Sequence, residues 1–147
     1  SILCPFLIIS ECIKYFSSLE CFEILSNNFN SQLIDVRTKP EWTYVGIPDL
    51  SSINKQVVFV SWKIYPKMKI NKFFESQVLK TNIKKNDNLF FICRSGSRSL
   101  NAAEFFISRG FSNCFNVSDG FEGKLNQHHK RGLIDGWQFN NLPWRHL

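Results

Sequence analysis

The sequence predicts an α/β fold with an open, mainly parallel central sheet of about five strands and helices on both faces. Short runs that are apolar throughout, such as LFFI at residues 89–92, alternate along the chain with segments of helical periodicity. Strands of this kind are typical of a parallel sheet that is covered on both faces. A chain of 147 residues is also the usual size of one compact domain, so a single domain over residues 1–147 is expected.

Helical periodicity and capping residues predict three helices. Ser17 and Glu20 have the spacing of a capping box, and the apolar residues that follow recur on one helical face. In the last helix, Ser99 is available as the N-terminal cap, and Gly110 stands where a C-terminal cap belongs. The helices are therefore expected at residues 17–28, 71–83 and 100–109.

Four apolar runs are the candidate strands of the sheet. Each is short and is bounded by turn-forming or charged residues, and Pro40 is expected to turn the chain away after the first of them. We expect an extra strand or an extended arm at residues 1–12 and an irregular tail at residues 120–147. The four predicted strands are residues 32–37, 57–60, 89–93 and 113–117.

Composition restricts the classes of function. Hydrophobic residues at 44% and charged residues at 20% describe an ordinary soluble globular protein. The net charge of +6 comes from scattered basic residues, so we expect anionic small molecules rather than nucleic acid as ligands. Five cysteines without a CxxC pair argue against a disulfide scaffold or a zinc site. We therefore expect a cytoplasmic protein without a metal ion, an organic cofactor or a membrane partner.

The stretch CRSGSRS at residues 93–99 is the strongest functional signal. It lies between a predicted strand and a predicted helix, where backbone N–H groups and the helix dipole favour a negative charge. Arg94 and Arg98 add positive charge, and Gly96 allows the loop to curl with its amides inward. These surroundings are expected to stabilise a Cys93 thiolate and to make it nucleophilic.

The chain resembles the rhodanese-like sulfurtransferase family in LIDVRTKPEW at residues 33–42, FFICRSGSRSLNAAEFFISRGF at residues 90–111, NVSDGFEG at residues 116–123 and GWQFNNLPW at residues 136–144. The finer resemblance is to single-domain rhodaneses of α-proteobacteria. The resemblance implies that Cys93 carries sulfur as a persulfide from a small anionic donor, such as thiosulfate, to a thiol or cyanide acceptor, with a sulfur-relay protein as one candidate partner. It implies a loop that binds the substrate anion, made of Arg94, Ser95, Gly96, Ser97, Arg98 and Ser99.

The same resemblance assigns supporting roles at the edge of the sheet. Asp35, Arg37 and Glu41 are expected to hold the active-site edge together through an arginine–carboxylate pair and hydrogen bonds to loops. One segment departs from the family pattern: the family commonly has Gly-His-Ile-Pro-Gly-Ala, whereas this chain has VGIPDL at residues 45–50, so the histidine is missing and Asp49 replaces a glycine.

Two other classes of function are alternatives. Cysteine phosphatases and arsenate reductases of related fold also use a thiolate in an arginine-containing loop, but they place five residues between the two, whereas four lie between Cys93 and Arg98. The shorter loop fits a sulfur atom better than a tetrahedral phosphate. A non-catalytic rhodanese-like module that binds a partner or senses redox state is the other alternative, although such modules often lose the cysteine.

Overall fold

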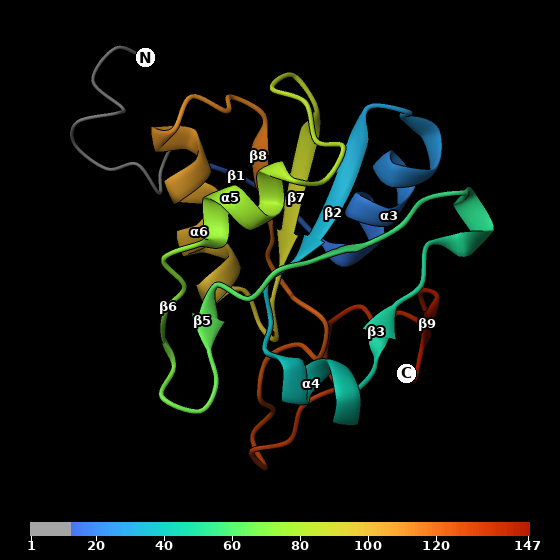
Figure 1. Ribbon diagram of the computed structural model, residues 1–147. Coiled ribbons are helices and arrows are strands. Elements are labelled where there is room, and N and C mark those ends of the chain that lie inside the picture. Colours follow the sequence, from blue (N-terminus) through green and yellow to red (C-terminus); the bar gives the residue numbers. More distant parts are fainter. Residues whose placement is uncertain (1–12) are drawn as a thin grey trace.

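The computed structural model describes residues 13–147 and shows the predicted parallel sheet (Figure 1). Its five strands run in the order β1-β8-β7-β2-β4, and every neighbouring pair is parallel. The arm or strand predicted for residues 1–12 lies outside the described residues. The prediction of the fold class is confirmed. The sheet strands are β1 (Lys14–Phe16), β2 (Ser31–Asp35), β4 (Val58–Phe59), β7 (Asn88–Ile92) and β8 (Cys114–Val117).

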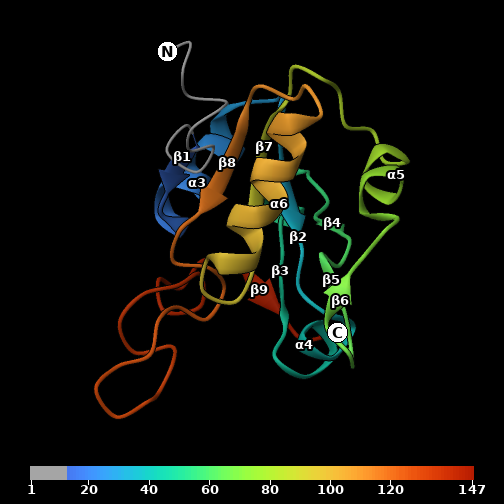
Figure 2. The same cartoon turned by 90° about the vertical axis from the view of Figure 1, so that its left-hand side faces the viewer.

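The alternation of side chains along β7 divides the interior into two hydrophobic clusters. Leu89, Phe91 and Cys93 belong to one cluster, and Phe90 and Ile92 belong to the other. Helices α5 and α6 pack into the first cluster, and α3 packs into the second, so both faces of the sheet are covered (Figure 2). The helices are α3 (Ser18–Asn27), α4 (Lys39–Tyr44), α5 (Phe74–Leu79) and α6 (Ser97–Ser108), with a 3-10 turn η1 at Ser51–Ile53.

Local capping explains where the two longest helices begin and end. Ser17 caps α3, since its side chain accepts from Glu20 N at 3.1 Å while Glu20 Oε1 accepts from Ser17 N at 2.9 Å, as the sequence predicted. Helix α6 ends at Ser108 with Arg109 as its C-cap; Gly110 follows with a φ of 95°, and Phe111 N donates to Phe106 O at 3.1 Å. That bond, with the one from Gly110 N to Ile107 O, forms a Schellman motif.

Several predicted boundaries are wrong, each for a local reason. Helix α6 begins at Ser97 with Gly96 as its N-cap, so Ser99 is not a cap and lies in the first turn. The helix expected at residues 71–83 is reduced to α5, because the Asn71 side chain accepts from Phe73 N and holds a turn there. Pro40 does not turn the chain away but lies in the first turn of α4, where a proline needs no N–H partner.

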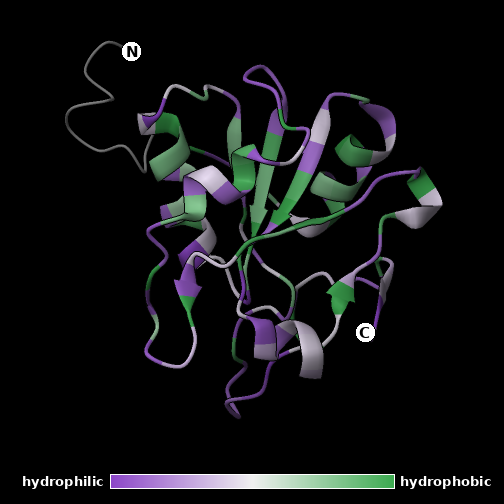
Figure 3. Ribbon diagram, viewed as in Figure 1, coloured by the Kyte–Doolittle hydropathy of each residue, from purple (hydrophilic) through white to green (hydrophobic). Residues whose placement is uncertain are grey.

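The tail at residues 120–147 is mostly irregular, but it is part of the core. Phe121 and Trp137 are fully buried in the α3-side cluster. The tail then forms β9 (Trp144–Arg145), which pairs with β3 (Ile47–Pro48) at the carboxyl end of the sheet. Strands β5 (Lys63–Ile64) and β6 (Lys69–Ile70) form a separate antiparallel hairpin. Hydrophobic residues gather in the central strands, while the hairpin and the tail loops are more hydrophilic (Figure 3).

Candidate active site

Cys93 directly follows β7 and lies against the start of α6. Only 1% of its surface is exposed. Its Sγ accepts a hydrogen bond from Gly96 N at 3.1 Å and lies 3.1 Å from Ser99 Oγ. Because the first N–H groups of a helix have no partner inside the helix, they and the helix dipole favour negative charge on the sulfur. The structure thus brings together three of the site residues expected from the sequence, Cys93, Gly96 and Ser99.

The turn after β8 holds the backbone of the Cys93 loop. Phe121 N donates to Cys93 O at 2.8 Å, and Glu122 N and Gly123 N donate to Arg94 O at 3.0 and 3.2 Å. At Gly120, with φ of 68°, a Cβ atom would overlap the Arg94 carbonyl group. A turn that is distant in the sequence therefore packs directly onto the backbone of the Cys93 loop and sets its shape.

Arg98 faces Glu41 of α4 rather than an open anion site. Its Nη1 and Nη2 donate to the two carboxylate oxygens of Glu41 at 2.7 and 2.8 Å. Glu41 Oε1 also accepts from Thr38 N and Oγ1. Burial alone would raise the pKa of Glu41, but the hydrogen bonds and charge of Arg98, followed by the bonds from Thr38, lower it from 4.5 to about 2. The pair thus stays ionised throughout the physiological range.

This pair predicts a distinct acid response. Because the pKa of Glu41 is lowered in the folded protein, its stabilising effect is complete above pH 4.5 and is lost as the pH falls through about 2. We expect Glu41→Gln to reduce the free energy of unfolding by about 1 kcal/mol at pH 6. Urea unfolding at pH 6, 4, 3 and 2 should show this difference shrinking below pH 4. A difference that stays constant down to pH 2 would contradict the ionic role.

Arg94 is the exposed arginine of the loop. Its side chain points to solvent, and the described residues 13–147 offer it no ion pair. Ser97 is also exposed, and Ser95 is half-buried. The two arginines that the sequence placed together in one anion-binding loop are therefore different in the structure: Arg98 is neutralised by Glu41, and Arg94 is available to solutes.

Asp35 and Arg37 form a fully buried ion pair at the carboxyl end of β2. Arg37 Nη2 lies 2.7 Å from Asp35 Oδ2, and its Nε donates to Oδ1 at 3.0 Å. The guanidinium also donates to Gly46 O at 2.9 Å and stacks over the Phe121 ring at 4.1 Å. The VGIPDL segment thus supports this edge through the backbone of Gly46, without a histidine.

Asn116 and Asp119 contribute to the site region but were not among the predicted site residues. Asn116, on β8, accepts from Ser99 Oγ at 2.6 Å and donates to Gly96 O at 3.1 Å. Asp119 accepts from Ser18 N and Oγ and from Gly136 N, and so ties α3 to the tail. One signal could have identified Asn116, since a polar residue inside a short apolar strand needs buried partners.

The other described cysteines are packing residues. Cys21 and Cys114 are buried and, like Cys93, free of disulfide bonds. Burial, followed by the charge of Asp119, raises the pKa of Cys21, and burial raises the pKa of Cys114 to about 12. The raised pKa values therefore disfavour the thiolate form of Cys21 and of Cys114. Among residues 13–147, no group of three or more His, Cys, Asp or Glu residues is arranged to hold a metal ion, and no helix is long and apolar enough to cross a membrane.

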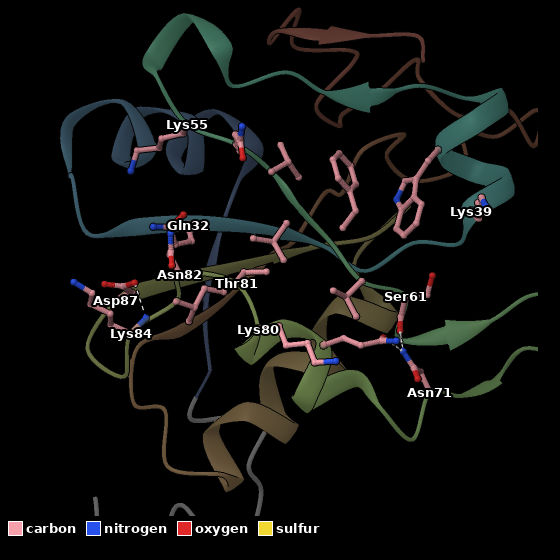
Figure 4. Close-up of a pocket in the computed structure, with 18 of the residues that line it drawn as sticks. Gln32, Lys39, Lys55, Ser61, Asn71, Lys80, Thr81, Asn82, Lys84 and Asp87 are labelled. Carbon is pink, nitrogen blue, oxygen red and sulfur yellow. Dashed lines mark hydrogen bonds between the residues drawn. The ribbon is translucent and has the colours of Figure 1, made fainter.

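A broad groove lies away from Cys93, beside the edge strand β4 (Figure 4). Polar and basic side chains including Gln32, Lys39 and Lys80 line it, together with Trp42. Its lining contains neither Cys93 nor any other residue of the 93–99 loop. The groove is therefore separate from the candidate active site.

A five-stranded parallel sheet with a cysteine loop between β7 and α6 defines a rhodanese-like domain, and the comparisons with known proteins agree. The chain belongs to the family described as STR4 middle domain, whose sequence model matches residues 14–146. An uncharacterized protein of Rickettsia conorii is 44% identical over 134 residues, which cover 90% of this chain and 98% of that protein.

Two further proteins are similar to this chain, one by its solved structure and one by its sequence. The crystal structure of Rv0390 from M. tuberculosis is similar with a TM-score of 0.82 and 39% identity, covering 90% of this chain and 96% of that one. The chloroplastic rhodanese-like domain-containing protein 4 of Arabidopsis thaliana is 25% identical over 128 residues, which cover 87% of this chain and 25% of that protein. The family membership therefore rests on the sequence model, and the solved structure shows that the fold is shared.

Proposed function

We propose that the protein is a sulfurtransferase that carries a sulfane sulfur as a persulfide on Cys93. The observation that carries the proposal is the position of the Cys93 sulfur at the start of α6, with the Gly96 N–H aimed at it at 3.1 Å. A loop N–H and a helix N-terminus stabilise an anionic sulfur without any metal ion. The rhodanese-like fold and the STR4 family membership agree with this chemistry.

The reaction needs two displacements at sulfur. In the first, the Cys93 thiolate attacks the outer sulfur of thiosulfate, a new S–S bond forms, and sulfite leaves with the electron pair of the broken S–S bond. The product is Cys93–S–S⁻. In the second, cyanide or a thiolate attacks the outer sulfur and restores the Cys93 thiolate. The total charge is the same on both sides of each step, and no external oxidant is needed.

The arginine geometry supports sulfur transfer over phosphate chemistry. A phosphatase needs its loop arginine to contact the transferred phosphate, but both terminal nitrogens of Arg98 bind Glu41. In the proposal, Arg98 fixes the loop to α4, and the exposed Arg94 attracts the anionic donor. A reducing compartment such as the cytoplasm suits this reaction, since the thiols of Cys21, Cys93 and Cys114 are free.

Intact mass spectrometry after incubation with thiosulfate tests the proposal. The wild-type protein should gain one sulfur atom, about 32 Da, which peptide mapping assigns to Cys93. Cys93→Ala should gain none, and added cyanide should remove the sulfur from the wild type. An unmodified wild type, or an adduct that persists in Cys93→Ala, would overturn the proposal. Cleavage of an aryl phosphate by the wild type, lost in Cys93→Ala, would point instead to the phosphatase alternative.

A further inference from the structure

Three buried side chains form a hydrogen-bonded chain behind the candidate nucleophile. Cys93 Sγ lies 3.1 Å from Ser99 Oγ, and Ser99 Oγ lies 2.6 Å from Asn116 Oδ1. Asn116 Nδ2 then donates to Gly96 O at 3.1 Å. The exposed fractions of Cys93, Ser99 and Asn116 are 1%, 0% and 2%, so solvent does not compete for these contacts.

The hydrogen atoms in this chain can be assigned by counting donors. A backbone carbonyl only accepts, so the group of Asn116 that faces Gly96 O is its NH₂, and its oxygen faces Ser99. An amide oxygen also only accepts, so the single hydroxyl hydrogen of Ser99 lies in the 2.6 Å bond to Asn116. The Ser99 oxygen therefore faces Cys93 with lone pairs only, and it can accept but not donate a hydrogen bond there. A protonated Cys93 therefore donates its S–H to Ser99 Oγ.

We propose that Asn116 is a positioning residue that withholds the Ser99 hydroxyl hydrogen from the Cys93 sulfur and so sets how readily the thiolate forms. When Cys93 ionises, its S–H bond breaks and the proton leaves to solvent, with the electron pair on sulfur. The Ser99 hydrogen can then turn to the sulfur only by leaving Asn116 Oδ1 as a buried acceptor without that donor. Asn116 and the thiolate thus compete for one hydrogen. The importance of this competition for sulfur transfer rests on the proposed function.

The competition acts within a fixed set of charges around the sulfur. Arg98 of α6 is held by Glu41 of α4, and the charges of Cys93 and Asp35 both act on Arg98. Asp35 is in turn neutralised by Arg37 after β2, and the neighbouring Arg94 is exposed. Substitutions at Asn116 or Ser99 leave all of these charged side chains in place.

The pH dependence of Cys93 alkylation by iodoacetamide tests the proposal, with Cys93 quantified by peptide mass. In Asn116→Leu, which removes the competing acceptor at similar volume, the pH of half-maximal rate should fall by about one unit, a rise of about tenfold in rate at lower pH. In the Ser99→Ala background the same substitution should leave the half-maximal pH unchanged, because no hydroxyl remains to be released. A half-maximal pH that is unchanged or higher in Asn116→Leu overturns the proposal.

A second variant separates this role from simple loop support. Asn116→Asp loses the same bond to Gly96 O but keeps an acceptor for Ser99 and adds a negative charge, so its half-maximal pH should rise rather than fall. If both variants move in the same direction, Asn116 only holds the loop and the proposal fails. Asn116→Asp carries the test alone if Asn116→Leu does not fold, as judged by circular dichroism. Alkylation needs no sulfur donor, so failure of persulfide loading would refute the proposed function without deciding this inference.

Discussion

Asp35→Ala is expected to lower the free energy of unfolding by about 3–5 kcal/mol, because it leaves a buried guanidinium without its counterion. Arg37 and Asp35 are both 0% exposed, and the Asp35 carboxylate accepts from two side-chain nitrogens of Arg37. After the substitution, Arg37 retains Gly46 O and the ring of Phe121. Within residues 13–147, its Nη1 already has no hydrogen-bond partner. Urea unfolding at neutral pH measures the loss.

Glu75→Ala is the matched control for this experiment. Glu75 also pairs with an arginine, Arg109, at 3.1 Å, but the two side chains are 27% and 55% exposed. We expect that substitution to cost at most about 1 kcal/mol. A double variant, Asp35→Leu with Arg37→Met, should recover part of the lost stability, since an apolar pair leaves no buried charge. Equal costs for Asp35→Ala and Glu75→Ala would show that burial of the ion pair is not what matters.

Gly120→Ala is expected to slow persulfide formation on Cys93 by about 100-fold or more, because small displacements of a reactive group cost rates of this size. The new Cβ atom would overlap the carbonyl of Arg94 and lie 2.7 Å from Ser95 N. These are backbone atoms of the nucleophile loop, so the loop itself must move. The rate of the mass gain with thiosulfate measures the effect, and far-ultraviolet circular dichroism checks that the sheet is retained.

Gly132→Ala provides the control for backbone strain. Gly132 also has a positive φ, 81°, but no atom of the described part of the chain lies within 4 Å of the Cβ position there. It should therefore cost about 1–2 kcal/mol of stability through strain and leave the rate of sulfur loading unchanged. Loading at the wild-type rate in Gly120→Ala would mean that contact with the 120 turn does not set the loop geometry.

Much of the fold could be predicted because its strands are apolar on both faces. The runs around β2, β7 and β8 stand out for that reason. Strand β1 was missed, since its Lys14 and Tyr15 are exposed and it has no apolar signature of its own; its pairing with β8 defines it. Helix α4 is not predicted, although Thr38 and Glu41 have the same spacing as Ser17 and Glu20, because Pro40 in the sequence indicates a turn.

The candidate site was predictable only where it is contiguous in sequence. The contacts of Cys93 with Gly96 and Ser99 depend on one strand-to-helix turn. The binding of Arg98 by Glu41 joins residues 57 positions apart, and charge counting along the loop could not reveal it. Asn116 lies 17 positions from Ser99, on a different strand. The position of the candidate nucleophile could therefore be predicted from the local sequence, whereas the tertiary fold determines which neighbours act on it.

The pairing of β1 with β8 also has a consequence for how the chain folds. Lys14–Phe16 pairs with residues 115–117, and Ser18 bonds to Asp119 across 101 positions. Contacts of such high sequence separation must wait for large loops to close, so we expect slow refolding compared with helical proteins of equal length. During synthesis, the turn that clamps the Cys93 loop emerges well after Cys93 itself. A nascent chain can thus fix the backbone of its Cys93 loop only after the turn at residues 120–123 has been made.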